Sequence, residues 1–277
     1  LQAVSKVSLD IGEREVFGLV GSNGAGKSTL LRMAAGILKP DEGEIRIDDL
    51  QVFDNEEAKK QIFYISDDCY FPANYTAADM ASFYRLYYPG FEHQRFSKLM
   101  RQFLLDESQK VSTFSKGMKK QLMTLIGICA GTKYLLCDET FDGLDPVVRQ
   151  GVKSLFAAEI MSRDFLPILA SHNLRELEDI CDHVGLLYKG GMLLSRNLED
   201  MKFHIHKMQC VFTDKKQEDA LKKELDVLKV DHQGSLVMIT ARGTRAEIMA
   251  KIQEKNPLFC EVLPLTLEEI FISETEV

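Results

Sequence analysis

A phosphate-binding pattern lies near the start of the chain, where GxxxxGK is followed by Ser. Its glycines let backbone N–H groups turn toward phosphate oxygens, and the helix that begins there adds partial positive charge. Lys27 then reaches the β- and γ-phosphates, and Ser28 offers its hydroxyl to Mg²⁺. A chance glycine-rich turn is disfavoured, because a predicted strand and a predicted helix flank the pattern in the required order. The nucleotide-binding residues predicted here are Gly21, Ser22, Asn23, Gly24, Ala25, Gly26, Lys27, Ser28 and Thr29.

Two adjacent carboxylates, Asp138 and Glu139, end a short apolar run of buried-strand type. In an open parallel sheet, ligands bind at the carboxyl ends of the strands. We expect Asp138 to hold Mg²⁺, directly or through water, and Glu139 to polarise a water molecule in line with the γ-phosphate. An ordinary solvated strand end is the alternative, which the upstream phosphate loop makes less favoured. A general base contributes about 10²–10⁴ in rate, so loss of Glu139 is expected to affect turnover more than binding.

Three lysines crowd the first turns of a predicted helix that Ser115 would cap: Lys116, Lys119 and Lys120. Each costs about 0.3–1 kcal/mol if solvated, because the helix dipole is positive at this end. They form either a basic, solvated face or part of a site where a phosphate supplies the missing anion. In the second reading Lys116 gains the anion, and at least one of the other two faces solvent or a partner.

Strands that alternate with helices position these motifs and predict an α/β domain with a largely parallel sheet. Residues 4–11 and 15–20 both alternate and predict an N-terminal β-hairpin. The other predicted strands are 44–47, 62–66, 134–137, 166–170, 184–188 and 191–195, and the predicted helices are 27–38, 118–130, 147–162 and 173–181.

A tyrosine-rich helical insert is predicted at about 67–113. Six of the eight tyrosines fall between Tyr64 and Tyr88, which sets this segment apart in composition. Tyrosine suits interfaces, because it combines a large apolar face with a polar tip. The rings form either a groove for a partner's helix or the core of the insert, with some residues in each role.

The pattern of elements changes beyond residue 202. Strand, helix, two strands, helix and strand follow in the order β-α-β-β-α-β, between 207–213 and 259–264. This order predicts a small α+β module over 203–277 and matches that of a ferredoxin-like module. The larger α/β domain is accordingly predicted to span 1–202.

The composition is that of a folded chain, with 45% hydrophobic and 27% charged residues. Apolar runs fall short of the roughly 18 residues that cross a bilayer, and a signal peptide is not evident. Six scattered cysteines without a CxxC pair are expected to stay reduced. The net charge of −8 argues against nucleic acid as the main partner. We expect a cytosolic chain, trimmed at its start because Leu1 is not Met, that acts at a membrane only through other chains.

The order of these motifs resembles the nucleotide-binding subunit of an ABC transporter over residues 1–200. Phe114–Met118 looks like the signature motif, Gly143–Pro146 is similar to the D-loop, and Ser171-His172 to the switch histidine. The resemblance implies a P-loop NTPase core of ABC type with an antiparallel β-subdomain, and hydrolysis of ATP with Mg²⁺. The signature form and Leu267–Phe271 look most like bacterial ATPases that energise drug, bacteriocin or peptide exporters.

The resemblance also implies a head-to-tail dimer, of like or related ATPase subunits, with two ATP molecules between the chains. Each phosphate loop would face Ser115, Lys116 and Gly117 of the other subunit, with Asp145 of the D-loop also at the nucleotide. His172 would touch the γ-phosphate and help to orient the attacking water. Transmembrane permease subunits would hold the dimer at the inner face of the cell membrane.

The chain departs from the family pattern at several positions. Asp67 stands where the family usually has Gln, and it is either a further oxygen ligand for Mg²⁺ or part of an acidic loop without a ligand role. Thr140–Asp142 replace the usual Pro-Thr-Ser, so the D-loop is expected to pack differently. The aromatic residue that stacks on adenine would lie upstream of Leu1. Weak, base-tolerant binding is therefore expected, with MgATP and MgGTP affinities within about tenfold, or about 1.4 kcal/mol.

A soluble, non-transport ABC ATPase that acts as a nucleotide-gated clamp or regulator is the alternative function. Repair clamps need long coiled-coil insertions, whereas 86 residues without sustained heptads separate Ser28 from Ser115. Translation clamps carry two ATPase units in one chain. A P-loop kinase leaves the signature-like stretch 113–121 without a role. The transported substrate, the direction of transport and the membrane partner are left open.

Overall fold

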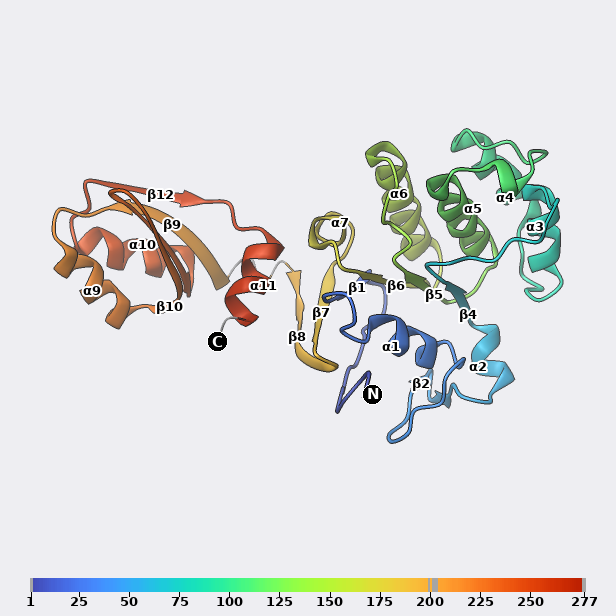
Figure 1. Cartoon of the computed structure of the whole chain (residues 1–277), viewed down its shortest axis with the longest axis horizontal. Coiled ribbons are helices and arrows are strands. Elements are labelled where there is room, and N and C mark those ends of the chain that lie inside the picture. The colour runs from blue at the N-terminus through green and yellow to red at the C-terminus, as the bar shows by residue number, and fades with distance from the viewer. Residues whose placement is uncertain (1, 199, 201–203, 276–277) are drawn as a thin grey trace. The chain divides into compact units, whose positions relative to one another are not determined.

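The computed structural model describes residues 2–198, 200 and 204–275. The chain divides into two compact units, Leu1–Ser195 and Arg196–Val277, whose helices and strands are labelled in Figure 1. The predicted domain boundary between residues 202 and 203 lies outside the described residues, so it stays a prediction. Within the described part of the chain, none of the helices combines the length and the apolar character needed to cross a bilayer.

A six-stranded sheet with the order β4-β5-β6-β1-β7-β8 forms the centre of the first unit. The pairs β4–β5, β5–β6, β6–β1 and β1–β7 are parallel, which confirms the predicted α/β fold. Parallel strands end at one common edge, so the segments that follow β1, β4, β5 and β6 meet there. The strands are β1 (Phe17–Val20), β4 (Ile62–Ile65), β5 (Tyr134–Asp138), β6 (Leu166–Ser171), β7 (His183–Tyr188) and β8 (Gly191–Asn197).

Helices and short turns surround this sheet. The first helix, α1, ends earlier than predicted, because Gly36 adopts a left-handed φ of +67°. The N–H groups of Gly36 and Ile37 then donate to Met33 O and Arg32 O, at 2.9 and 2.8 Å, which closes the helix end. The elements are α1 (Lys27–Ala34), β2 (Arg46–Ile47), β3 (Leu50–Gln51), α2 (Glu56–Lys60), α3 (Ala77–Arg85), α4 (His93–Gln102), η1 (Val111–Thr113), α5 (Lys116–Cys129), α6 (Pro146–Ser162) and α7 (Leu174–Glu178).

The predicted N-terminal hairpin is wrong. Residues 4–11 lack strand structure, although Val7, Leu9 and Ile11 pack against the core. The strand that they were expected to pair with, β1, is already paired with β6 on one side and β7 on the other. The alternation of apolar and polar residues in 4–11 therefore comes from an extended segment that buries one of its sides. The small sheet of β2 and β3 is antiparallel.

The second unit is an antiparallel sheet with the strand order β10-β11-β9-β12, accompanied by helices. Its core includes Met208, Leu221, Ile239, Ile248 and Ile252, which are all fully buried. This strand order agrees with the connectivity of a ferredoxin-like module. The ferredoxin-like assignment itself stays a prediction. The elements are β9 (Ile205–Val211), α9 (Lys215–Glu224), β10 (Asp226–Gln233), β11 (Leu236–Arg242), α10 (Arg245–Glu254), β12 (Phe259–Leu263) and α11 (Leu267–Thr275).

A buried carboxylate, Glu159 on α6, ties the helical insert to the rest of the first unit. Its side chain is 1% exposed and pairs with Arg95 of α4. Arg163 Nε lies 2.6 Å from the same carboxylate. A buried charge is tolerated only when it is paired, so α4 depends on this contact as well as on its apolar face.

We expect Glu159→Ala to lower the free energy of unfolding of the first unit by about 3 kcal/mol, because two arginines lose their buried partner. Glu92→Ala is the matched control, since Glu92 pairs with Arg95 while 53% exposed. That change should cost less than about 1 kcal/mol. Urea unfolding followed by circular dichroism measures both, because the chain has no Trp to report by fluorescence. Equal losses for the two variants would contradict the anchoring role.

Candidate functional site

The phosphate loop connects β1 to α1 and is shaped by two left-handed glycines. Gly24 has a φ of +80° and Gly26 a φ of +105°. A side chain at Gly26 would come within 2.4 Å of the carbonyl oxygen of Ala3, so only glycine fits there. A side chain at Gly24 would meet no described atom within 4 Å, so the loop is open on that side. The backbone therefore faces free space at the point where α1 begins.

This free space is a pocket of about 710 Å³, a size typical of small-molecule sites. The residues that the sequence predicts in it come from four different strand ends. Gly21, Ser22 and Ala25 of the loop shape its backbone without lining the pocket in the described part of the chain. The pocket is lined by Gln2, Ala3, Asn23, Gly24, Gly26, Lys27, Ser28, Thr29, Asp67, Glu139, Asp142, His172, Lys189 and Gly190.

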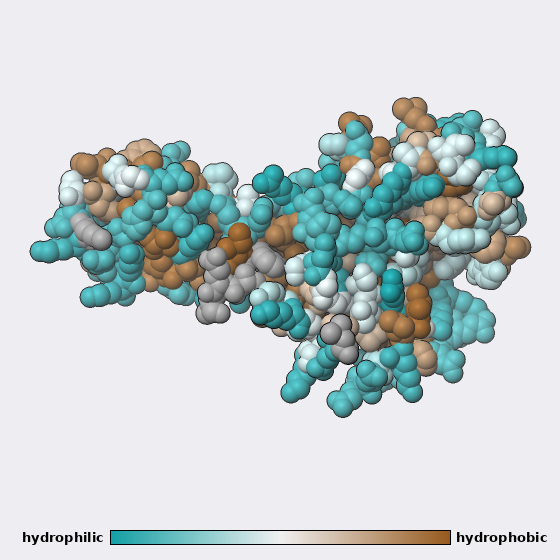
Figure 2. All heavy atoms as spheres, in the orientation of Figure 1, coloured by the Kyte–Doolittle hydropathy of each residue, from teal (hydrophilic) through white to brown (hydrophobic). Residues whose placement is uncertain are grey.

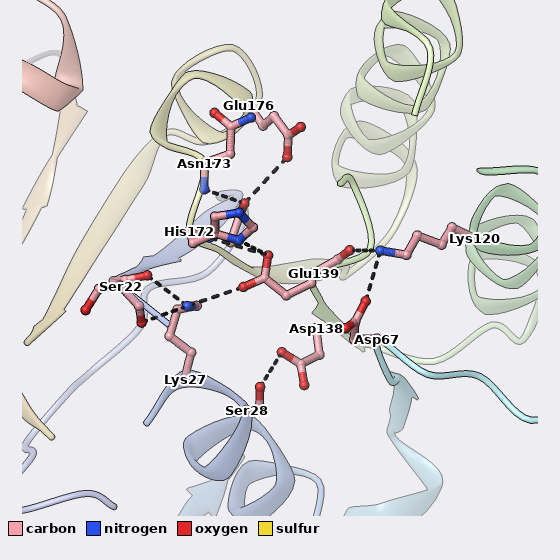
Figure 3. Close-up of polar contacts among 12 residues, drawn as sticks. Ser22, Lys27, Ser28, Asp67, Lys120, Asp138, Glu139, His172, Asn173 and Glu176 are labelled. Atoms are coloured by element: carbon pink, nitrogen blue, oxygen red, sulfur yellow. Dashed lines mark hydrogen bonds and ion pairs between the residues drawn. The ribbon is translucent and has the colours of Figure 1, made fainter. Parts of the chain in front are cut away.

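Lys27 lines the pocket, and its side chain is only 5% exposed. Its ammonium group donates to Gly21 O at 2.8 Å and to Ser22 O at 3.3 Å. The carboxylate oxygen Oε1 of Glu139 lies 3.3 Å from the ammonium group, and Figure 3 marks this contact. Two backbone carbonyls and one carboxylate thus hold the lysine at the mouth of the phosphate loop.

Glu139 follows β5 in a left-handed conformation, with a φ of +49°. A non-glycine residue rarely adopts this φ, and such strain often marks a functional site. Its Oε2 lies 2.8 Å from Nδ1 of His172, which follows β6. The structure therefore brings the three predicted catalytic residues, Lys27, Glu139 and His172, into direct contact.

Ser28 and Asp138 lie together deeper in the site. Ser28 Oγ donates to Asp138 Oδ1 at 2.9 Å, and the hydroxyl of Tyr64 donates to Oδ2 at 3.2 Å. Burial raises the pKa of Asp138, while these two hydrogen bonds act in the opposite direction. A hydroxyl and a carboxylate are the oxygen donors that Mg²⁺ takes, so the pair fits this metal.

Asp67, the third predicted metal ligand, lies at the edge of the pocket and is 51% exposed. Its Oδ1 lies 3.1 Å from the ammonium group of Lys120. A lysine and a metal ion compete for the same carboxylate oxygen. The metal role of Asp67 is thus the least supported of the three.

The signature-like residues are not among those that line the pocket of their own chain. Ser115 caps α5 by accepting a hydrogen bond from Met118 N at 3.1 Å. Lys116 is 70% exposed, with Nζ 4.0 Å from Asp142 Oδ2. A side chain at Gly117 would lie 3.2 Å from Gly143 O, so α5 packs closely on the D-loop-like turn.

Asp145 also lies outside the described pocket lining. Its carboxylate caps α6 by accepting from Val147 N at 2.8 Å. The nucleotide contacts expected of Asp145, and of Ser115, Lys116 and Gly117, therefore require a second chain and stay predictions.

The three lysines of α5 occupy different environments. Lys119 is half-buried, and its Nζ lies 5.8 Å above the ring of Phe71. The solvated-face reading is wrong for Lys120, which is 3% exposed. Sequence reasoning found neither this burial nor the contact of Tyr64 with Asp138, since neither belongs to a local motif. The pocket residues that it missed are Gln2, Ala3, Asp142, Lys189 and Gly190.

Comparison with known proteins gives one family. A family model described as ABC transporter matches residues 4–142. The ABC transporter ATP-binding protein YtrB of Bacillus subtilis (strain 168) is 30% identical over 99% of this chain and 93% of its own length. The bacitracin transport ATP-binding protein BcrA of Bacillus licheniformis is 25% identical over 97% of this chain and 89% of its own.

Solved structures are similar over most of the chain. An ATP-binding subunit of an ABC transporter has a TM-score of 0.65 and 26% identity, and covers 72% of this chain and 85% of its own. A dimeric ATP-binding cassette in a post-hydrolysis state, with ADP and Pi, has a TM-score of 0.63 and 20% identity, over 71% and 90%. The second likeness shows the fold alone.

We expect Asp138→Asn to stabilise the nucleotide-free protein at neutral pH, because burial raises the pKa of Asp138 and makes its ionised form costly. The gain in the free energy of unfolding should fade as the pH falls through that raised pKa, because Asp138 of the unmodified protein is then protonated and no longer carries a buried charge. MgATP at about 100 times its dissociation constant should stabilise the unmodified protein by about 2.7 kcal/mol, and the variant by much less.

Thermal unfolding with and without MgATP, at several pH values, measures both effects. Asp68→Asn is the control, because Asp68 is exposed and adjacent to the site. An Asp138→Asn protein that is less stable than the unmodified one at pH 7, or that keeps the full MgATP effect, would refute this account.

Proposed function

This chain belongs to the ABC transporter ATP-binding proteins, and on that premise we propose that two such subunits close around two MgATP molecules to drive export through separate membrane subunits. Like the family, it binds ATP with Mg²⁺ and hydrolyses the nucleotide. The observation that carries the proposal is the convergence of Lys27, Glu139 and His172 at one pocket beside the phosphate loop. Export is supported by the similarity to BcrA, which is named as a bacitracin transport ATP-binding protein.

The residues of the pocket divide the work of hydrolysis. The phosphate loop and Lys27 bind the phosphates of ATP. The phosphate oxygens then compete with the carboxylate of Glu139 for the ammonium group of Lys27. Ser28 and Asp138 would hold Mg²⁺, which when bound neutralises charge on the phosphates. Glu139, freed from Lys27, then polarises the attacking water, and its contact with His172 holds the direction of the carboxylate.

The predicted nucleotide-binding residues that do not line the pocket of their own chain are proposed to act in dimer closure. Ser115, Lys116, Gly117 and Asp145 would meet the nucleotide of the other subunit, where the N-terminus of α5 offers N–H groups to the γ-phosphate. Two chains of net charge −8 repel one another, although salt screens charges beyond about 8 Å. We therefore expect closure to depend on MgATP. A solved relative of the same fold is dimeric.

The tyrosine-rich insert is proposed to dock the membrane subunit and hold the ATPase at the inner, cytoplasmic face of the membrane. Some of its rings are core, because Tyr84 and Tyr88 each lie 5.1 Å from Phe63 between ring centroids. Others are exposed, and Figure 2 shows apolar surface in the region of α3. The exposed apolar residues of α3 and its flanks, here called the α3 patch, are Tyr70, Phe83, Leu86 and Tyr87.

A clamp function finds less support. The insert carries α3 and α4, which have 9 and 10 residues, whereas the arms of a clamp need long coiled coils. A regulator without hydrolysis is disfavoured, because the residues needed for catalysis are in contact.

We expect Glu139→Gln to lower ATP hydrolysis about 10²–10⁴-fold, because the general base is lost. MgATP binding should be retained, since the change also removes a competitor for Lys27. With turnover blocked, the variant should run as a dimer on size exclusion with MgATP and as a monomer without it. Glu42→Gln, at an exposed carboxylate, serves as the control. Hydrolysis within tenfold of the unmodified protein, or a variant that stays monomeric with MgATP, would count against the proposal.

Charges placed in the α3 patch should abolish docking without affecting the pocket. Leu86→Lys and Tyr87→Glu are expected to prevent copurification of the membrane chain from the native complex, while hydrolysis by the isolated chain stays within about twofold, or about 0.4 kcal/mol. The control is Leu104→Lys, an exposed leucine elsewhere on the insert. Undiminished copurification of the membrane chain with both patch variants would rule out this docking face.

A further inference from the structure

Lys120 is a buried lysine to which the proposed reaction gives no role. It lies on the second turn of α5, where its side chain is 3% exposed. A buried ammonium group is costly unless its hydrogen-bonding capacity is used. It donates to Asp67 Oδ1, at 3.1 Å, and to the carbonyl oxygen of Glu139. Figure 3 marks both contacts. One side chain thus connects α5 to the segments that follow β4 and β5.

The contact with Glu139 falls on a strained peptide. With its φ of +49°, Glu139 needs support from its surroundings to stay in this conformation. Its N–H donates to Ala170 O at 2.9 Å, and its carbonyl accepts from Lys120. Both sides of the residue are therefore tied, which fixes the direction in which its carboxylate leaves the backbone. Without Lys120, the carbonyl side is released.

The contact with Asp67 balances charge at the edge of the pocket. Asp67 lines the pocket and is 51% exposed, so an unpaired carboxylate there would face the bound phosphates. The Lys120 ammonium group neutralises it and occupies Oδ1. This pair explains how an acidic residue is tolerated at this position without acting as a ligand of the metal.

We propose that Lys120 is a positioning residue for ATP hydrolysis, which fixes the backbone of Glu139 and keeps Asp67 out of the Mg²⁺ site. Because Lys120 and the residues Ser115 and Gly117 share α5, it also links the partner's nucleotide to the catalytic carboxylate of its own chain. This inference rests on the proposed function. A residue with a purely structural role would instead alter stability and leave turnover by the folded protein intact.

The test compares Lys120→Met with Lys119→Met in the full chain. Both changes replace a lysine of α5 by an unbranched apolar residue, but only Lys120 touches Glu139. We expect kcat to fall about 10²-fold in Lys120→Met, because a small misplacement of a catalytic group has this effect. KM for MgATP should stay within about threefold, or about 0.65 kcal/mol, in both variants. Lys119→Met should keep the kcat of the unmodified protein.

A second pair of measurements tests the role of Asp67. Asp67→Asn should leave the Mg²⁺ concentration for half-maximal activity unchanged within about twofold, or about 0.4 kcal/mol. A rise of tenfold or more would make Asp67 a metal ligand and overturn that part of the inference. In the double variant Lys120→Met/Asp67→Asn, kcat should be no lower than in Lys120→Met, because the two residues act as one unit.

The outcomes separate this inference from the proposed function. If the unmodified chain hydrolyses ATP, Glu139→Gln does not, and Lys120→Met keeps its kcat within threefold, only the inference fails. If Glu139→Gln still hydrolyses ATP, the proposed function fails first. Thermal unfolding checks that each variant is folded. Should Lys120→Met not fold, Lys120→Gln replaces it, because Gln is uncharged and one atom shorter and cannot hold both Asp67 and the carbonyl of Glu139; an unchanged kcat in that variant overturns the inference.

Discussion

The carboxylate of Glu139 lies between Lys27, 3.3 Å from one oxygen, and His172, 2.8 Å from the other. This contact joins the ends of β1, β5 and β6, three neighbouring strands whose order places their carboxyl ends side by side. The parallel sheet, the helices that cover it and the left-handed glycines of the phosphate loop all serve to hold these groups at one pocket. Because the three residues follow the ends of rigid strands, the positions of their backbones are set before nucleotide binds.

Charge is balanced pair by pair around this pocket. Lys27 and Lys120 are both buried; Lys27 contacts a carboxylate and two backbone carbonyls, and Lys120 contacts a carboxylate and one backbone carbonyl. Asp138 is buried and accepts hydrogen bonds from two hydroxyl groups, and burial raises its pKa. The site thus keeps one carboxylate in an unfavourable environment that a divalent cation would relieve. Stability is given up at the position where Mg²⁺ is expected to bind.

The sequence alone predicted the α/β fold, the phosphate loop and the paired carboxylates, because each depends on a local backbone requirement. Glycines at fixed spacing permit left-handed turns, and an apolar run that ends in Asp138 and Glu139 is read as a buried strand. The hairpin prediction failed for residues 4–11, because pairing depends on whether a distant strand has a free edge. Here β6 and β7 occupy both edges of β1.

The amino-acid sequence by itself determined which groups are available for chemistry, their order along the chain and the elements that carry them. Only the tertiary structure decided which of three similar lysines on one helix is buried, and that it meets Asp67 and the carbonyl of Glu139. The helix-dipole rule treats these lysines alike, because it depends on their position in the helix. Burial depends on what packs against each face of the helix, and residues far away in the sequence supply those contacts.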